Sequence, residues 1–90
     1  MTRARRRRPK PGRHLKPIDA AALVALDGDL AARHAELLGQ GFRLAKSVRP
    51  YLSSRNVLTL RFVWRKRDDG LTVVHEWIDR FHLSDILSTQ

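Results

Sequence analysis

The stretch NVLTLRFVWRKRDDGLTVVHEWID, residues 56–79, decides the fold, because it has the pattern of two β-strands joined by a tight turn. The Asp69-Gly70 dipeptide at its centre favours a two-residue hairpin loop in which both residues take positive φ angles. Side chains alternate between apolar and polar on either side of this loop. On the first strand, one face is made of Leu58, Leu60, Phe62 and Trp64. The stretch therefore predicts an antiparallel β-hairpin.

The two-residue loop also predicts the register of this hairpin, since a slip of one residue would exchange its two faces. Counting outward from the loop places Phe62 opposite Trp77 and Trp64 opposite His75. Val73 joins the same face. Because these side chains are large and mostly apolar, we expect this face to pack against a helix.

The other face of the hairpin is polar and carries arginine. It contains Thr59, Arg61, Val63 and Arg65. Glu76 lies diagonally between Arg61 and Arg65, so part of this positive charge is expected to have a structural partner. The hairpin tip, residues 65–70, fits a wing that probes a nucleic-acid groove and fits an ordinary solvated turn equally well.

Upstream of the hairpin, residues 18–39 have the periodicity of a helix that begins after Asp19 as N-cap. At about 100° per residue, the leucines fall on one stripe: Leu23, Leu26, Leu30, Leu37 and Leu38. The stripe keeps its phase across Gly28, which favours one long helix ending at Gly39. The alternative is two shorter helices, the second capped by Asp29. His34 lies within the stripe and is expected to be buried or interfacial.

Residues 42–49 are predicted to form a short basic helix that ends at Pro50, because Phe42, Ala45 and Val48 share one helical face. Helix, glycine turn and basic helix is the outline of a DNA-reading helix-turn-helix motif. The simpler interpretation is a basic helix that packs on the first one. Ser84 is expected to cap a last, short helix.

These elements predict an α+β fold class: a long N-terminal helix and a short basic helix packed on an antiparallel β-hairpin, with a short C-terminal helix. We expect one small domain over residues 18–90, preceded by a disordered basic arm over residues 1–17. At this size a single core is marginal, so a homodimer is one expected assembly.

The arm holds eight Lys or Arg residues and no acidic residue, a composition that no packed core can use. Its prolines oppose helix formation, and its arginines have the planar fork that grips phosphate in two places. Residues 41–67 contain a further eight bases and no acid. We therefore expect the binding of nucleic acid by the following residues: Arg3, Arg5, Arg6, Arg7, Arg8, Lys10, Arg13, Lys16, Arg43, Lys46, Arg49, Arg55, Arg65, Lys66 and Arg67.

Several functional classes lack their sequence signals. The chain has no cysteine, which excludes disulfides and thiolate zinc sites, and it has no glycine-rich phosphate loop. The segment His75-Glu-Trp-Ile-Asp79 lacks the second histidine of the zinc-protease pattern. We expect no metal, no cofactor and no enzymatic activity. No apolar run reaches membrane-spanning length, so we expect a cytoplasmic protein without a membrane partner.

The favoured function is a small non-enzymatic nucleic-acid-binding protein, with DNA slightly preferred to RNA. Most of the aromatic rings that RNA recognition uses for stacking are expected to be needed in the core, with Tyr51 as the exception. The alternative is a regulator or inhibitor that docks its basic surface on an acidic protein partner.

A third interpretation rests on a resemblance. The stretch LTLRFVWRKRDDGLTVVHEW, residues 58–77, loosely resembles the arginine-rich antiparallel sheet of small bacterial ribonuclease toxins of the RelE and HigB kind. This resemblance implies an RNA-cleaving site in which Arg61, Arg65 and His75 contact phosphate and transfer protons. It covers only the hairpin, and that fold normally starts with a strand instead of a proline-containing arm.

Overall fold

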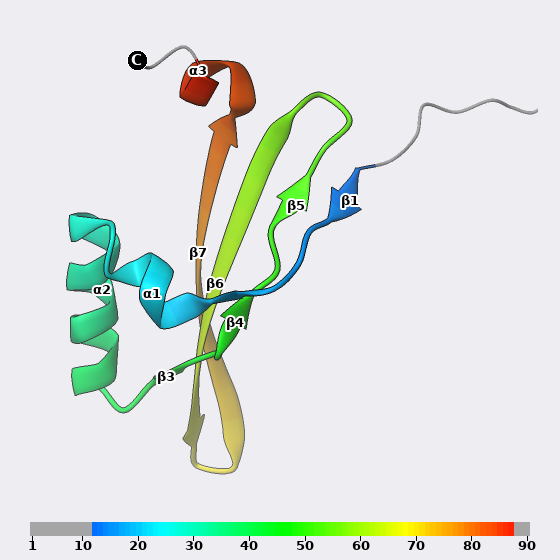
Figure 1. Cartoon of the computed structure of the whole chain (residues 1–90). Coiled ribbons are helices and arrows are strands. Elements are labelled where there is room, and N and C mark those ends of the chain that lie inside the picture. The colour runs from blue at the N-terminus through cyan, green and yellow to red at the C-terminus, as the bar shows by residue number, and fades with distance from the viewer. Residues whose placement is uncertain (1–11, 88–90) are drawn as a thin grey trace, which may run out of the picture.

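The computed structural model describes residues 12–87 and has a mixed α+β fold with an antiparallel sheet at its centre (Figure 1). The predicted hairpin is confirmed: β6 (Val57–Asp68) and β7 (Leu71–His82) pair along all 12 residues of each strand. Phe62 lies opposite Trp77, as the two-residue loop requires. Asp69 and Gly70 have φ angles of 54° and 82°, which is why a residue pair that tolerates positive φ stands here.

Shorter strands pair with the other edge of β6. Antiparallel strands β3 (Arg43–Leu44) and β5 (Tyr51–Leu52) lie one after the other along it, and β1 (Arg13–His14) pairs with β5. Between β3 and β5 the chain leaves the sheet as β4 (Ser47–Val48), which pairs with β2 (Ile18–Asp19). At the end that bears β1, the strand order is therefore β1, β5, β6, β7.

The predicted basic helix over residues 42–49 is wrong, because this segment forms β3 and β4. Gly41, at a φ of 94°, turns the chain back beside β6, and the Ala45 N–H donates to the Val63 carbonyl at 2.8 Å. The edge of β6 thus satisfies backbone groups that a helix would have paired internally. The helix-turn-helix interpretation fails with it, since no second helix follows the glycine turn.

The single long helix is also wrong. The chain forms α1 (Ala20–Val24) and α2 (Gly28–Gly39), and Leu26 is 82% exposed in the break between them. Asp19 caps α1 as predicted by accepting a hydrogen bond from the Ala22 N–H. The second cap is Asp27 and not Asp29: its carboxylate accepts from two N–H groups of the first turn of α2, at 3.0 and 3.2 Å.

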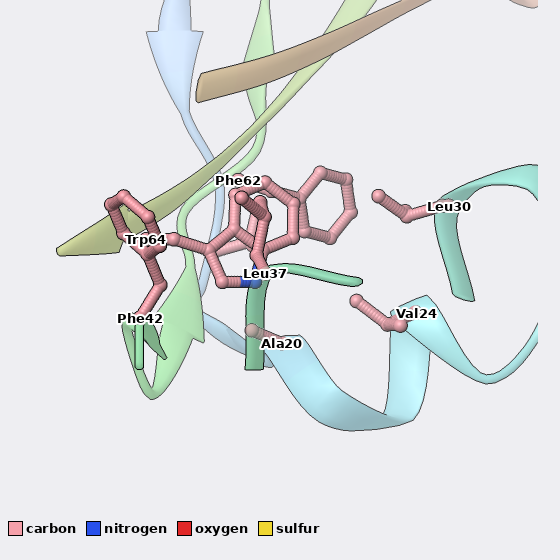
Figure 2. Close-up of a cluster of buried hydrophobic side chains, with 8 residues drawn as sticks. Ala20, Val24, Leu30, Leu37, Phe42, Phe62 and Trp64 are labelled. Atoms are coloured by element: carbon pink, nitrogen blue, oxygen red, sulfur yellow. The ribbon is translucent and has the colours of Figure 1, made fainter. Parts of the chain in front are cut away.

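Both helices lie on one side of the hairpin and leave its two ends uncovered (Figure 1). Phe62 and Trp64 of β6 point toward Leu30 and Leu37 of α2 in the core (Figure 2), which consists of Ala20, Val24, Leu30, Leu37, Phe42, Val48, Phe62 and Trp64. The short helix α3 (Leu83–Leu87) follows β7 as expected, but Ser84 is not its cap: it lies inside the helix, and its hydroxyl is 2.7 Å from the His82 Nδ1. Within residues 12–87, no helix is both long and apolar enough to cross a membrane.

His34 is half-buried and accepts a hydrogen bond at its Nδ1 from the Trp64 Nε1–H, over 2.9 Å. An indole N–H in a core needs such an acceptor, because leaving it unpaired would cost about 1–3 kcal/mol. The histidine therefore has a structural role in joining α2 to the sheet.

Candidate nucleic-acid interface

The sheet has one face packed against α1 and α2, here called the helix-covered face, and one that neither helix covers, here called the open face. Strand alternation assigns the side chains: Phe62 and Trp64 point to the helices, so the odd-numbered residues of β6 point to the open face. Across the hairpin, the even-numbered residues of β7 share that face. The open face of the hairpin consists of Val57, Thr59, Arg61, Val63, Arg65, Arg67, Thr72, Val74, Glu76, Ile78, Arg80 and His82.

Two arginines lie directly opposite each other on this face. Arg43 of β3 is the register partner of Arg65 of β6, and both are exposed. Like charges placed directly across two strands destabilise a sheet. Neither guanidinium forms an ion pair or side-chain hydrogen bond with another residue in the described part of the chain. The pair is therefore a local cost to folding, and no acidic side chain in residues 12–87 pairs with either charge.

A shallow cavity of about 450 Å³ lies beside this pair, near the tip of the hairpin. Its lining consists of Gly41, Arg43, Arg65, Lys66, Arg67 and Thr72. The Lys66 side chain is already engaged: its Nζ donates to the Gln40 carbonyl and lies 5.0 Å from the centre of the Phe42 ring. The three arginines are thus the groups of this cavity that can receive an anion.

A second hollow on the open face has a volume of about 380 Å³ and lies near β1 and β5. Its lining consists of His14, Arg49, Tyr51, Thr59, Arg61 and Val63. The rings of His14 and Tyr51 meet edge to face, with 5.1 Å between their centres. A Cβ atom at Gly12 would lie 2.6 Å from the Tyr51 hydroxyl and closer still to the Leu52 carbonyl, so only glycine fits under this ring.

Negative charge is largely kept away from the open face. Asp27 caps α2, and Arg33 pairs with Glu36 on the helical side. Among the open-face positions of the hairpin, Glu76 is the acidic residue, and it forms an ion pair with Arg61. This pair confirms the expected structural partner of Arg61. Arg49, Arg65 and Arg67 form no ion pair with an acidic residue of the described part of the chain.

The structure gathers some of the predicted binding residues and separates others. Arg43, Arg49, Arg65 and Arg67 lie on or beside the open face. Arg13 pairs with Leu52 and so lies at the end of the helix-covered face, while Lys16, Lys46 and Arg55 are exposed elsewhere. The remaining predictions fall outside residues 12–87: Arg3, Arg5, Arg6, Arg7, Arg8 and Lys10.

Residues 12–16 belong to the segment expected to be an arm, yet Arg13 and His14 pair with β5, and the Leu15 N–H donates to the Pro50 carbonyl at 2.8 Å. This pairing brings His14 onto the open face, a position that no pattern in the sequence indicates. Arg80 was also missed. It lies opposite Thr59, a position that counting outward from the Asp69-Gly70 loop would have revealed.

The residue set implied by the toxin resemblance is not brought together. Arg61 and Arg65 are on the open face, whereas His75 is opposite Trp64 on the helix-covered face. The His75 ring makes an edge-to-face contact with the Phe42 ring at 4.8 Å. In the part of the chain that the structure describes, no cluster of His, Asp and Glu residues could hold a metal ion.

Comparison with protein-family models, with curated proteins and with solved structures found no match to this chain. Its function is therefore inferred from the chemistry of its own residues.

Proposed function

We propose that this protein binds single-stranded nucleic acid across the open face of its sheet. The observation that carries the proposal is the direct pairing of Arg43 with Arg65, two exposed arginines with no acidic partner in residues 12–87. An anion that lies between the two charges would replace this repulsion with attraction to both arginines. Departures from local stability of this kind are expected at functional sites.

The anion best suited to this surface is a chain of phosphates. Arg67 follows Arg65 on the same face, and Arg49 lines the second hollow toward β5. Positive groups are therefore repeated along the length of the sheet, as the phosphates of a polynucleotide are. A guanidinium can donate two parallel hydrogen bonds to one phosphate, which a lysine ammonium cannot.

The aromatic pair on the same face favours a single strand over a duplex. Tyr51 and His14 lie between arginines and present rings against which an unpaired base can stack. In a duplex the bases are already stacked on each other, and reading them requires an element that enters a groove. The described residues contain no recognition helix of the kind expected from the sequence.

The basic residues of the N-terminal segment extend the same chemistry. Arg3, Arg5, Arg6, Arg7, Arg8 and Lys10 precede β1, and β1 is next to the hollow that contains Tyr51. We propose that this segment contacts phosphates without reading sequence, while the open face supplies both phosphate contacts and base stacking.

The test is a fluorescence-anisotropy titration of the full chain with labelled single-stranded DNA, single-stranded RNA and duplex DNA at several salt concentrations. The variant Arg43→Gln/Arg65→Gln should weaken single-strand binding and reduce the slope of log affinity against log salt by about 1.4, which is roughly 0.7 for each phosphate that is no longer neutralised. The matched control Arg33→Gln removes a charge from the helical side and should leave the slope unchanged.

A second variant pair separates stacking from charge. Tyr51→Leu should lose about 1–3 kcal/mol of single-strand binding free energy, whereas Tyr51→Phe keeps the ring and should bind normally. The proposal of single-strand binding would be contradicted if the wild-type chain preferred duplex DNA, or if Tyr51→Leu bound single strands as tightly as the wild-type chain. Absence of binding to every polynucleotide in dilute buffer would leave an acidic protein as the partner of the open face.

A further inference from the structure

We propose that two copies of this protein pair through β7, antiparallel and edge to edge, so that their sheets join into one. β7 pairs with β6 along one edge, and no described strand lies along the other. An unpaired edge of 12 residues is long for a small domain, and such edges are templates for pairing with another chain.

The hydrogen bonds of β6 indicate which backbone groups point to the free edge of β7. On the β3 and β5 side of β6, the Val63 carbonyl accepts from Ala45 and the Val57 carbonyl accepts from Ser53. The odd-numbered residues of β6 thus bond to that side, so its even-numbered residues bond to β7. Their register partners on β7 are odd-numbered. The N–H and C=O groups of the even-numbered residues of β7 therefore point outward, in position to pair with a further strand.

This edge lacks several of the features that keep edge strands from pairing, although it does carry three charged side chains, Glu76, Asp79 and Arg80. β7 contains no proline, glycine or lysine, and its register with β6 runs without a bulge. Large apolar side chains are exposed along it: Leu71 is 71% exposed, and Val74, Ile78 and Phe81 are also exposed. A second β7 strand would cover part of this apolar surface as well as the outward backbone groups.

Charge selects a register for the pairing. When Ile78 lies opposite Ile78 of the second copy, Glu76 lies opposite the second copy's Arg80, and the two-fold axis repeats this ion pair. Centring the pair on Glu76 or on Asp79 would instead place two carboxylates opposite each other. Centring it on Trp77 would place both Glu76 and Arg80 opposite apolar residues. Hydrogen-bond geometry is met in the Ile78 register, because even-numbered residues oppose even-numbered residues.

The same register determines how the two copies face. Opposite residues of an antiparallel pair point to the same side, so both open faces lie on one side of the joined sheet and both helical layers on the other. The arginines of the two copies would then lie on the same side of the joined sheet. The pairing itself needs no nucleic acid, so its test does not depend on whether the proposed function is correct.

The absence of cysteine in the chain permits a direct test by cross-linking. Facing residues of a hydrogen-bonded antiparallel pair have Cα atoms about 5.5 Å apart, within the range that a disulfide spans. Under mild oxidation Ile78→Cys should therefore form a covalent dimer, visible on a non-reducing gel. Val74→Cys is the matched control on the same strand and face: its copy lies eight residues away, about 26 Å, and it should not cross-link.

Charge reversal tests the pairing without a covalent bond. In sedimentation equilibrium the wild-type chain should have twice its monomer mass of 10.4 kDa. Arg80→Glu should weaken the dimer at least tenfold, and adding Glu76→Arg to it should restore dimerisation. Arg55→Glu, away from β7, should not change the association, and circular dichroism should be the same for all variants. A monomer at every concentration, equal cross-linking of the two cysteine variants, or a dimer unaffected by Arg80→Glu would overturn the proposal.

Discussion

Neighbouring residues of β6 belong to two surfaces with opposite requirements. On the helix-covered face, Phe62 and Trp64 are almost completely buried, and the indole N–H has its acceptor in His34. On the open face, Arg61 and Arg65 are exposed, and Arg65 lies opposite another arginine. Around Phe62 and Trp64 the first face is closely packed, whereas the second has charges without ion-pair partners. Consecutive residues of β6 thus alternate between the core, which stabilises the fold, and the candidate binding surface.

The largest expected effect is on the helix-covered face. Trp64→Ala would remove the largest buried side chain and leave a cavity between β6 and α2, so we expect a loss of about 3–5 kcal/mol in the free energy of unfolding. Urea denaturation followed by circular dichroism measures it. Arg65→Ala, the adjacent residue, should change the free energy of unfolding by less than about 1 kcal/mol. Equal losses in the two variants would contradict the division between the faces.

The second largest loss of stability is expected when the hydrogen bond between His34 and Trp64 is removed. His34→Leu would leave the buried indole N–H without its acceptor, and we expect a loss of about 1–3 kcal/mol in the free energy of unfolding. In the double variant His34→Leu/Trp64→Phe the indole N–H donor is also gone. Its loss in the free energy of unfolding should therefore be smaller than the sum of the losses of the two single variants. Additive losses would indicate that the two side chains act independently.

A substitution in the Asp69-Gly70 turn, which fixes the register of the hairpin, should cause a moderate loss of stability. Gly70 has a φ of 82°, and a Cβ there would meet no atom within 4 Å, so Gly70→Ala tests backbone strain alone. We expect a loss of about 1–2 kcal/mol in thermal or urea unfolding. Gly28→Ala is the control, because that glycine also has open space but begins a helix at ordinary φ. It should be neutral or slightly stabilising.

The smallest expected effect on the free energy of unfolding is a gain in stability. Arg65→Thr would remove the repulsion with Arg43 and introduce a residue that favours strands, so the free energy of unfolding should rise by about 0.2–1 kcal/mol. The same variant should bind single strands more weakly. A gain in stability together with a loss of binding would identify Arg65 as a residue kept for a ligand. A loss of stability would show that the pair has a structural use.

The hairpin could be predicted from the sequence because its determinants are local. Asp69-Gly70 selects the loop, the loop selects the register, and alternation then assigns Phe62 and Trp64 to one face and the arginines to the other. Both helical caps are also local, yet Asp27 was overlooked. The leucine stripe keeps its phase whether or not the helix breaks, so periodicity could not distinguish one helix from two.

The segment 42–49 was predicted incorrectly for a different reason. Phe42, Ala45 and Val48 are spaced as on a helix, and Phe42 and Val48 are indeed buried. Their backbone, however, finds hydrogen-bond partners on β6 and β2, far along the chain. A pattern of side chains records which residues are buried, and it does not record what the backbone pairs with. Tertiary pairing overrides local propensity in such a segment.

Four arginines of the candidate site were expected from the charge of the sequence alone: Arg43, Arg49, Arg65 and Arg67. Their arrangement was not, because it depends on β3 and β5 lying beside β6. That arrangement places Arg43 against Arg65 and brings His14 to Tyr51. Strand alternation places Lys66, an expected binding residue, on the helix-covered side, where its Nζ donates to the Gln40 carbonyl.

By itself, the sequence determined the hairpin, its register and its two unlike faces, since a loop type and a period of two are properties of adjacent residues. Only the tertiary structure decided how β3 and β5 lie beside β6 and which cations gather on the open face. Those outcomes depend on pairing between segments that are distant in the chain. For β3 and β6 that pairing puts two like charges together, a cost that the burial of Trp64 and Phe62 on the reverse side can offset.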